Sequence, residues 1–113
     1  MADITSEHWL TVPEVCERLG LSPGKVHRLV EERGLMGIKT AGVFRIPEVF
    51  LDGAEPLKDL RGTAVVLIDG GFTEEAAVDW LLSESADLGV SPVAALHQGR
   101  KAEVRRLAQS LAL

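Results

Sequence analysis

The sequence predicts a mainly α-helical fold with one small β-hairpin. Two short segments with apolar residues at helical spacing meet at a Gly-Leu-Ser corner within residues 12–33. Two β-like segments flank a Thr-Ala-Gly turn within residues 36–46. Beyond residue 72, Thr and Ser residues of the kind that cap helices precede further apolar stripes. The order of these signals, more than any single residue, determines the predicted architecture.

The first helix is predicted over residues 12–19. Thr11 occupies its N-cap position with Glu14 three residues later, a spacing in which each side chain accepts a hydrogen bond from an unpaired amide of the first turn. Gly20 suits the left-handed conformation that ends many helices. Cys16 lies among aliphatic residues here, so we expect a small buried side chain rather than a reactive thiol.

The second helix is predicted to begin with Ser22 as N-cap and Pro23 in the first turn, to run to about Arg33, and to be stopped by Gly34. Helical spacing places one apolar group inward, Val26, Leu29 and Val30, and one charged group outward, Lys25, His27, Arg28, Glu31 and Glu32. The outward face is therefore basic in its first half and acidic in its second.

A hairpin follows, with strands expected at about 36–39 and 43–46 and a turn at 40–42. Pro47 then opens a third short helix that ends at residue 50 or 51. A helix pair joined by a tight turn and followed by a small hairpin is the layout of a winged helix-turn-helix.

The second half is predicted to form a compact helical extension. The apolar run Ala64–Ile68 favours a strand, with a buried helix as the alternative. Helices are expected after Thr73 and Ser91, and a last helix over about residues 100–111. In the last helix, the inward residues are Val104, Leu107, Ala108 and Leu111, and the outward residues are Arg100, Lys101, Arg105 and Arg106.

The predicted organisation is an N-terminal tail at 1–9, a winged helix-turn-helix domain at 10–52, and a mostly helical domain at 57–113 that packs on the first. A chain of 113 residues with 46% hydrophobic composition can bury a core. Its longest apolar run falls far short of the roughly 20 residues of a membrane span, and its N-terminus lacks the layout of a signal peptide. We therefore expect a cytoplasmic protein with no membrane partner.

The net charge of -5 is unevenly distributed. Residues 52–95 carry nine carboxylates and two cations, whereas residues 10–51 carry a net charge of +1 and residues 96–113 a net charge of +3. Phosphate binding needs a basic face rather than a basic total, because charges act within a Debye length of roughly 8 to 10 Å at physiological salt. The overall charge lowers the expected affinity for a polyanion without excluding it.

No enzyme chemistry is indicated. The three histidines, His8, His27 and His97, show no metal-ligand spacing with each other or with Cys16. The Asp69-Gly70-Gly71 turn lacks the glycine spacing of phosphate-cradling loops. The sequence therefore predicts no catalytic residue, no metal and no cofactor.

The stretches LTVPEVCERLGLSPGKVHRLVEERGL and GIKTAGVFRIPEVFL resemble the winged helix-turn-helix domains of excisionases and MerR-type regulators. With VLIDGGFTEEAAVDWLL and PVAALHQGRKAEVRRLAQ, nearly the whole chain from Trp9 onward resembles a small actinobacterial family of DNA-binding proteins known as substrates of a Ser/Thr protein kinase. The resemblance implies a double-stranded DNA-binding protein, a transcriptional or nucleoid-associated regulator, whose second helix enters the major groove.

Residue types suggest how such an interface works. Ser22 and the first amides of the second helix suit a phosphate, and Arg28 suits a bidentate contact to guanine. Wing residues suit contacts to the DNA backbone or minor groove. The candidate DNA-binding residues are Ser22, Lys25, His27, Arg28, Lys39, Thr40 and Arg45.

Each assignment has a plainer alternative. The charged face of the second helix can be a solvated surface with ion pairs along the helix, and Arg45 can anchor the wing to Glu48. We expect the cations of the last helix to pair with carboxylates of the same chain or at a dimer interface, rather than to contact DNA. AAVDWLLSESADLGVSPVAAL is also similar to the partner-binding domain of some antitoxins, so the rival function is a protein-interaction module with little DNA affinity. A monomer or weak homodimer is expected.

The family resemblance further implies phosphorylation in the N-terminal tail, with a Ser/Thr protein kinase as partner. Thr5 and Ser6 are the candidate acceptors. A phosphate there would add about -2 charge at neutral pH and would weaken DNA binding by repulsion.

Overall fold

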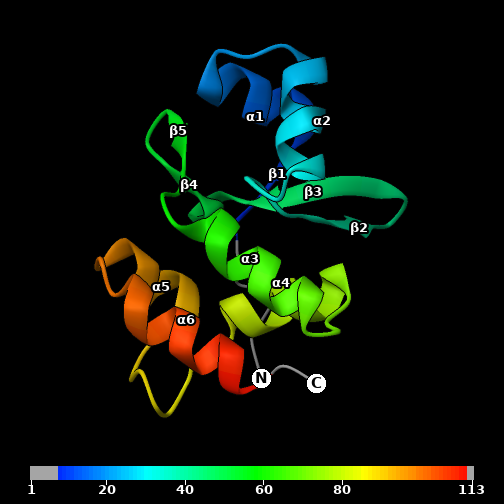
Figure 1. Ribbon diagram of the computed structural model, residues 1–113. Helices are drawn as coiled ribbons and strands as arrows, with labels where there is room; N and C mark the ends of the chain where they lie inside the picture. The colour runs from blue at the N-terminus through cyan, green and yellow to red at the C-terminus, as the bar shows by residue number, and fades with distance from the viewer. Residues whose placement is uncertain (1–7, 112–113) are drawn as a thin grey trace.

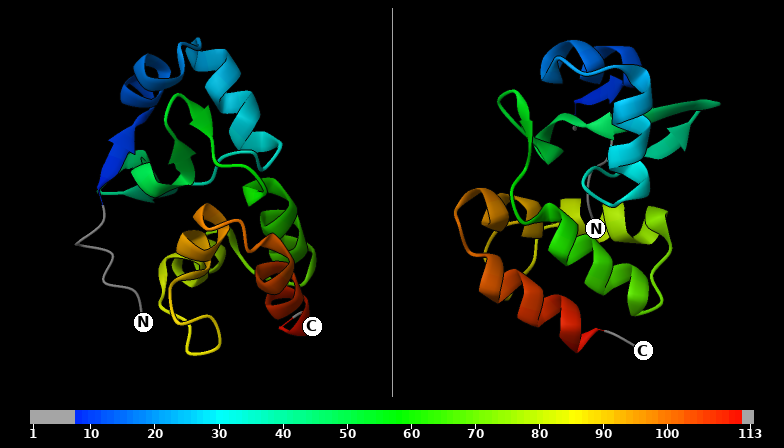
Figure 2. Two further views of the ribbon diagram at one scale, coloured as in Figure 1. Left: turned by 90° about the vertical axis from the view of Figure 1, so that its left-hand side faces the viewer. Right: turned by 45° about the horizontal axis from the view of Figure 1, so that its top comes forward.

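The computed structural model describes residues 8–111 and shows a small antiparallel sheet between two groups of helices (Figure 1). Helices α1 and α2 lie on one side of the sheet, and α3 to α6 gather on the other, as the two further views also show (Figure 2). In chain order the elements are β1 Trp9–Thr11, α1 Val12–Leu19, α2 Pro23–Glu31, β2 Ile38–Thr40, β3 Val43–Pro47, the 3-10 turn η2 Glu48–Phe50, β4 Leu51–Asp52, β5 Glu55–Pro56, α3 Leu60–Asp69, α4 Glu74–Leu82, α5 Pro92–His97 and α6 Lys101–Ser110.

The first two helices confirm the predicted caps. The Thr11 amide donates to Glu14 Oε1 over 2.9 Å, and the Glu14 amide donates to Thr11 Oγ1 over 3.4 Å, which completes the capping box. Helix α2 ends at Glu31, before the predicted end at Arg33. Arg33, just after the helix, adopts the left-handed conformation with φ 66°, and Gly20 has the left-handed conformation predicted for it, with φ 67°.

The sheet has the strand order β1-β3-β2. Strand β1 was not predicted, because its three residues include Thr11, whose dominant signal is the helix cap. Strand β2 begins at Ile38 rather than at Met36, and Met36 is 3% exposed and belongs to the core. The expected third helix is a single 3-10 turn, η2, followed by the short hairpin of β4 and β5.

The predicted strand at Ala64–Ile68 is wrong, and the alternative, a buried helix, is confirmed. Helix α3 buries Leu60, Thr63, Ala64 and Leu67, which recur at the spacing of one helical face. The five apolar residues alone have no period, so only the residues that flank them reveal the helix.

Helices α4 and α5 begin at their predicted caps: the Ala76 amide donates to Thr73 Oγ1 over 3.1 Å, and the Ala94 amide donates to Ser91 Oγ over 3.2 Å. Helix α6 differs from the prediction at two residues. Leu111, expected inward, is 40% exposed because it lies beyond the last helical turn. Arg105, expected outward, is half-buried against Gly62 of α3.

One hydrophobic core joins the two halves of the chain. Leu35 and Ile46 from the first half, and Leu60 and Leu81 from the second, are all fully buried in it. Within residues 8–111, no helix is long and apolar enough to span a membrane.

Candidate nucleic-acid interface

The exposed face of α2 carries the basic residues that the sequence predicts there. Val26 is fully buried, whereas its neighbours Lys25, His27 and Arg28 are exposed. The helix is thus fixed by its inner side, and its outer side is accessible to a partner. Among the residues that the structure describes, neither Lys25 nor Arg28 takes part in an ion pair. Their charges are not neutralised by a direct partner.

The start of α2 is suited to an anion. Ser22 Oγ accepts a hydrogen bond from the Lys25 amide over 3.3 Å, so the predicted phosphate contact of Ser22 shares this oxygen with helix capping. Pro23 has no N–H, which leaves the exposed Gly24 to supply the other amide of the first turn. The positive end of the helix dipole and the adjacent Lys25 favour a negative group at this point.

The wing is a two-residue hairpin whose turn matches the twist of its strands. Ala41 and Gly42 both have positive φ, 51° and 80°, as the favoured two-residue hairpin turn requires. The tip extends outward beyond the helices (Figure 2). Val43 next to the turn is 42% exposed, so the tip presents an apolar side chain rather than a charge.

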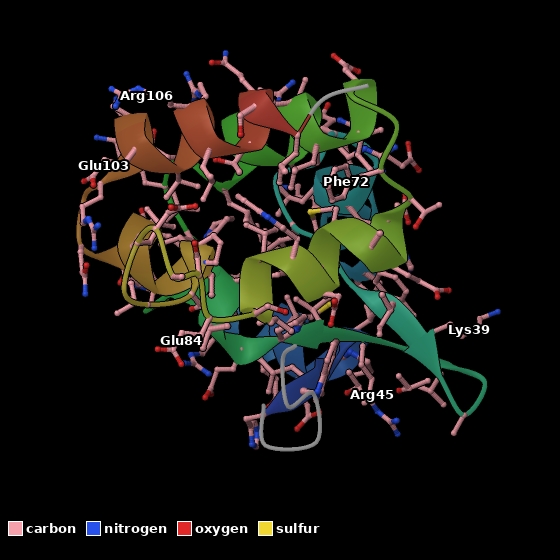
Figure 3. All side chains as sticks on the ribbon, turned by 90° about the horizontal axis from the view of Figure 1, so that it is seen from below. Lys39, Arg45, Phe72, Glu84, Glu103 and Arg106 are labelled. Atoms are coloured by element: carbon pink, nitrogen blue, oxygen red, sulfur yellow. The ribbon has the colours of Figure 1, made fainter. Side chains whose placement is uncertain are left out.

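Two of the predicted wing residues, Lys39 and Arg45, lie on opposite faces of the hairpin. Lys39 pairs with Phe44, and Arg45 pairs with Ile38, so the alternation along a strand separates the two side chains. Figure 3 shows them leaving the wing in different directions. They therefore do not form one basic patch.

Arg45 and Thr40 brace the hairpin. Arg45 Nη1 donates to Thr40 Oγ1 over 2.9 Å and lies 3.5 Å from the Thr40 carbonyl oxygen, across the two strands. Arg45 does not form the alternative pair with Glu48. The Glu48 carboxylate instead accepts a hydrogen bond from Arg18, with 2.9 Å between Arg18 Nη1 and Glu48 Oε2. That hydrogen bond lowers the pKa of the Glu48 carboxyl.

Lys39 lies in an acidic setting that the sequence did not reveal. A groove of about 430 Å³ between the wing and the start of α4 is lined by Gly37, Ile38, Lys39, Phe44, Thr73, Glu74 and Glu75. The two carboxylates come from a segment more than thirty residues away in sequence, so no local pattern indicates their proximity. They reduce the positive potential that Lys39 presents.

An ion pair joins the segment that follows α2 to the start of α4: Arg33 Nη1 donates to Glu74 Oε1. Two acidic residues near the same end of α2, Glu31 and Glu32, are exposed. The outer face of α2 is thus basic over its first half and acidic at its end, as predicted. A phosphate backbone fits the first half only.

In the part of the chain that the structure describes, no three His, Cys, Asp or Glu side chains lie close enough to hold a metal ion. His97 Nε2 is 2.8 Å from the Val49 carbonyl oxygen, which gives that histidine a structural role between α5 and η2. Thr5 and Ser6 lie outside the described residues.

Comparisons with known proteins cover both halves of the chain. Residues 3–51 match the family model "DNA-binding protein Rv2175c, wHTH domain", and residues 57–112 match "Rv2175c C-terminal domain of unknown function". The chain is 32% identical over 114 residues to the "DNA-binding protein Rv2175c" of Mycobacterium tuberculosis (strain ATCC 25618 / H37Rv), with 89% of this chain and 78% of that protein aligned.

The fold is shared with a solved structure, "NMR structure of Rv2175c". The TM-score is 0.86 at 30% sequence identity, and the match covers 96% of this chain and 83% of the other. The winged helix-turn-helix half comes first in the chain and the helical half follows it, which is the order in which the two family models match. The chain belongs to the Rv2175c family.

Proposed function

We propose that the protein binds double-stranded DNA through its winged helix-turn-helix and acts as a transcriptional or nucleoid-associated regulator. The observation that carries the proposal is the outer face of α2, where Lys25, His27 and Arg28 are exposed around a buried Val26. The name of the relative, a DNA-binding protein, supports the same class of partner.

In the proposed complex, the first half of α2 enters the major groove. A phosphate lies at the helix start near Ser22 and Gly24, Lys25 contacts the backbone, and Arg28 contacts a base edge. A bidentate contact of arginine to guanine contributes about 1 to 3 kcal/mol of discrimination against other bases. Glu31 and Glu32 face away from the phosphates, because carboxylates there repel the backbone.

The wing contributes less charge than its sequence suggests. Arg45 stabilises the hairpin through its hydrogen bond to Thr40. Lys39 contacts the DNA backbone, and the nearby carboxylates Glu74 and Glu75 weaken its attraction to phosphate. The wing tip, with Val43 exposed, makes an apolar contact with the minor groove. Binding is therefore modest in strength and decreases readily as salt rises.

Fluorescence-anisotropy titrations of a labelled duplex at several salt concentrations test this proposal. The Lys25→Ala, Arg28→Ala double variant should weaken binding at least tenfold and lower the magnitude of the salt slope by about 0.9, because only Lys25 of the two is proposed to contact a phosphate. Lys58→Ala, Arg61→Ala is the matched control, since it removes two exposed cations from the other half of the chain. If both double variants weaken DNA binding equally, or if the wild type does not bind DNA at low salt, the DNA proposal fails and the protein-interaction function becomes the better account.

We also propose that a phosphate on Thr5 or Ser6 weakens DNA binding. The tail leads directly into β1, which pairs with the central strand β3 of the wing. Treatment with a Ser/Thr kinase, followed by phosphopeptide mapping and titration of the modified protein, tests the proposal. An unmodified tail, or an unchanged affinity after modification, contradicts it.

A further inference from the structure

A second basic site lies on α6, in the half of the chain whose family model carries no function. A shallow hollow of about 280 Å³ is lined by Lys101, Ala102, Arg105, Arg106 and Gln109. Three of these five side chains are cations, none is a carboxylate, and the glutamine adds an amide donor. The surrounding chain is acidic, with a net charge of -7 over residues 52–95, so this concentration of positive charge is local.

The central arginine of the hollow is held in place and lacks a carboxylate partner. A Cβ atom at position 62 would lie 2.1 Å from Arg105 Nη2, so Gly62 is the residue that lets the guanidinium lie against α3. Arg105 Nε is buried and has no hydrogen-bond partner among the described residues. Arg105 as a whole is half-buried and lines the hollow, so its positive charge is accessible to an anion there.

Carboxylates flank the hollow on one side without lining it. Glu103, which accepts a hydrogen bond from Arg100 Nε over 2.9 Å, and Asp87 line a neighbouring hollow that Arg106 also lines. Lys101 Nζ lies 3.9 Å from Asp59 Oδ1, a loose contact that keeps the lysine exposed. Among residues 8–111, Arg105 and Arg106 form no ion pair.

The chemistry of the hollow fits phosphate better than a protein surface. Arginine forks bind phosphate oxygens in pairs, and interfaces with nucleic acid are polar and strongly positive. Protein interfaces instead depend on buried aromatic or aliphatic anchors, and the only apolar residue lining this hollow is Ala102.

The position of the hollow indicates which phosphate it meets. Arg106 and the wing residue Lys39 lie at opposite ends of the molecule (Figure 3), whose longest dimension is 36 Å. A duplex seated on α2 and the wing therefore does not reach α6 without bending around the protein. We infer that the hollow of α6 binds the backbone of a second DNA segment, so that one protein molecule bridges two duplexes. This inference rests on the proposed function of α2.

A capture experiment tests the bridge. One duplex is fixed to beads, the full-length protein is added at low salt, and retention of a second, fluorescent duplex is measured. The wild type should retain the second duplex. Lys101→Ala, Arg106→Ala should reduce retention about tenfold while its anisotropy titration with a single duplex stays within about twofold of wild type. Lys58→Ala, Arg61→Ala is the matched control, because it removes two exposed cations of the same half that do not line the hollow.

The outcomes separate the two sites. Absence of single-duplex binding by the wild type marks a failure of the proposed function itself, whereas loss of binding in Lys25→Ala, Arg28→Ala alone supports it. Normal single-duplex binding without capture by wild type overturns the bridge. Capture that survives Lys101→Ala, Arg106→Ala also overturns it and points to bridging by a dimer. If sedimentation shows self-association that this double variant abolishes, the hollow binds an acidic surface of a second copy instead.

Discussion

The two halves of the chain use their helices differently. Helices α1 and α2 each bury one residue fully, Val15 and Val26, and leave most of their surface in solvent. Helices α3 and α4 each bury four residues and form the core on which the sheet rests. The exposed surface that can recognise a partner thus lies on helices with little buried area, whereas α3 and α4 are held by extensive burial in the shared core.

The largest expected effect comes from the core of the second half. Leu67→Ala should lower the free energy of unfolding by about 2 to 5 kcal/mol, because Leu67 is 1% exposed and its loss leaves a cavity. Urea denaturation measures the change. The Lys25→Ala, Arg28→Ala variant should unfold within about 0.5 kcal/mol of wild type, as surface substitutions do. A similar loss in both variants would contradict the exposure of this face of α2.

A smaller effect is expected where the wing meets the core. A Cβ atom at Gly37 would lie 2.3 Å from the Arg45 carbonyl oxygen, a backbone atom that cannot move independently. Gly37→Ala should therefore cost about 1 to 3 kcal/mol of stability and displace the wing. Gly24→Ala is the matched control, since no atom lies within 4 Å of its Cβ position and alanine favours a helix by up to about 1 kcal/mol. Equal stability of the two variants would show that the wing is not held at Gly37.

The two helix caps of the first half differ in what they add to binding. Thr11→Ala and Ser22→Ala should each cost about 1 kcal/mol in thermal or urea unfolding, because each loses the oxygen that accepts a first-turn amide. Only Ser22→Ala should also weaken DNA binding in the anisotropy assay. Thr11→Ser should restore the first cap. If Thr11→Ala weakens DNA binding as much as Ser22→Ala, the phosphate contact at the start of α2 is wrong.

The smallest expected effect concerns the ion pair between the halves. Arg33 and Glu74 are 29% and 50% exposed, so their coupling energy should be only about 0.2 to 1 kcal/mol. A double-mutant cycle of Arg33→Ala and Glu74→Ala, followed by urea denaturation, measures it. A coupling near zero would mean that this ion pair adds nothing to the contact between the halves.

Local signals in the sequence predicted the parts of the fold that local physics determines. The caps at Thr11, Ser22, Thr73 and Ser91 all occur where expected, because a capping hydroxyl and the amides it accepts lie within three residues. The strand expected at Ala64–Ile68 was wrong, because a fully apolar run looks alike in a buried strand and a buried helix.

For the candidate site, helical spacing was sufficient to place Lys25, His27 and Arg28 on one exposed face. It could not reveal the carboxylates of α4 beside Lys39, or the hydrogen bond that makes Arg45 a brace. The first depends on packing between segments more than thirty residues apart, which leaves no trace in a local pattern. The second lies within one hairpin and depends on the strand register that places Arg45 and Thr40 on the same face.

The central claim is that DNA contacts the first half of α2 and the wing tip. The most direct measurement is an NMR titration of the ¹⁵N-labelled protein with less than one equivalent of a short duplex. We expect amide shifts at residues 22–28 and 39–43, and little change in α3 to α5. Shifts confined to residues 57–111, or the same shifts in the Lys25→Ala, Arg28→Ala variant, would contradict the claim.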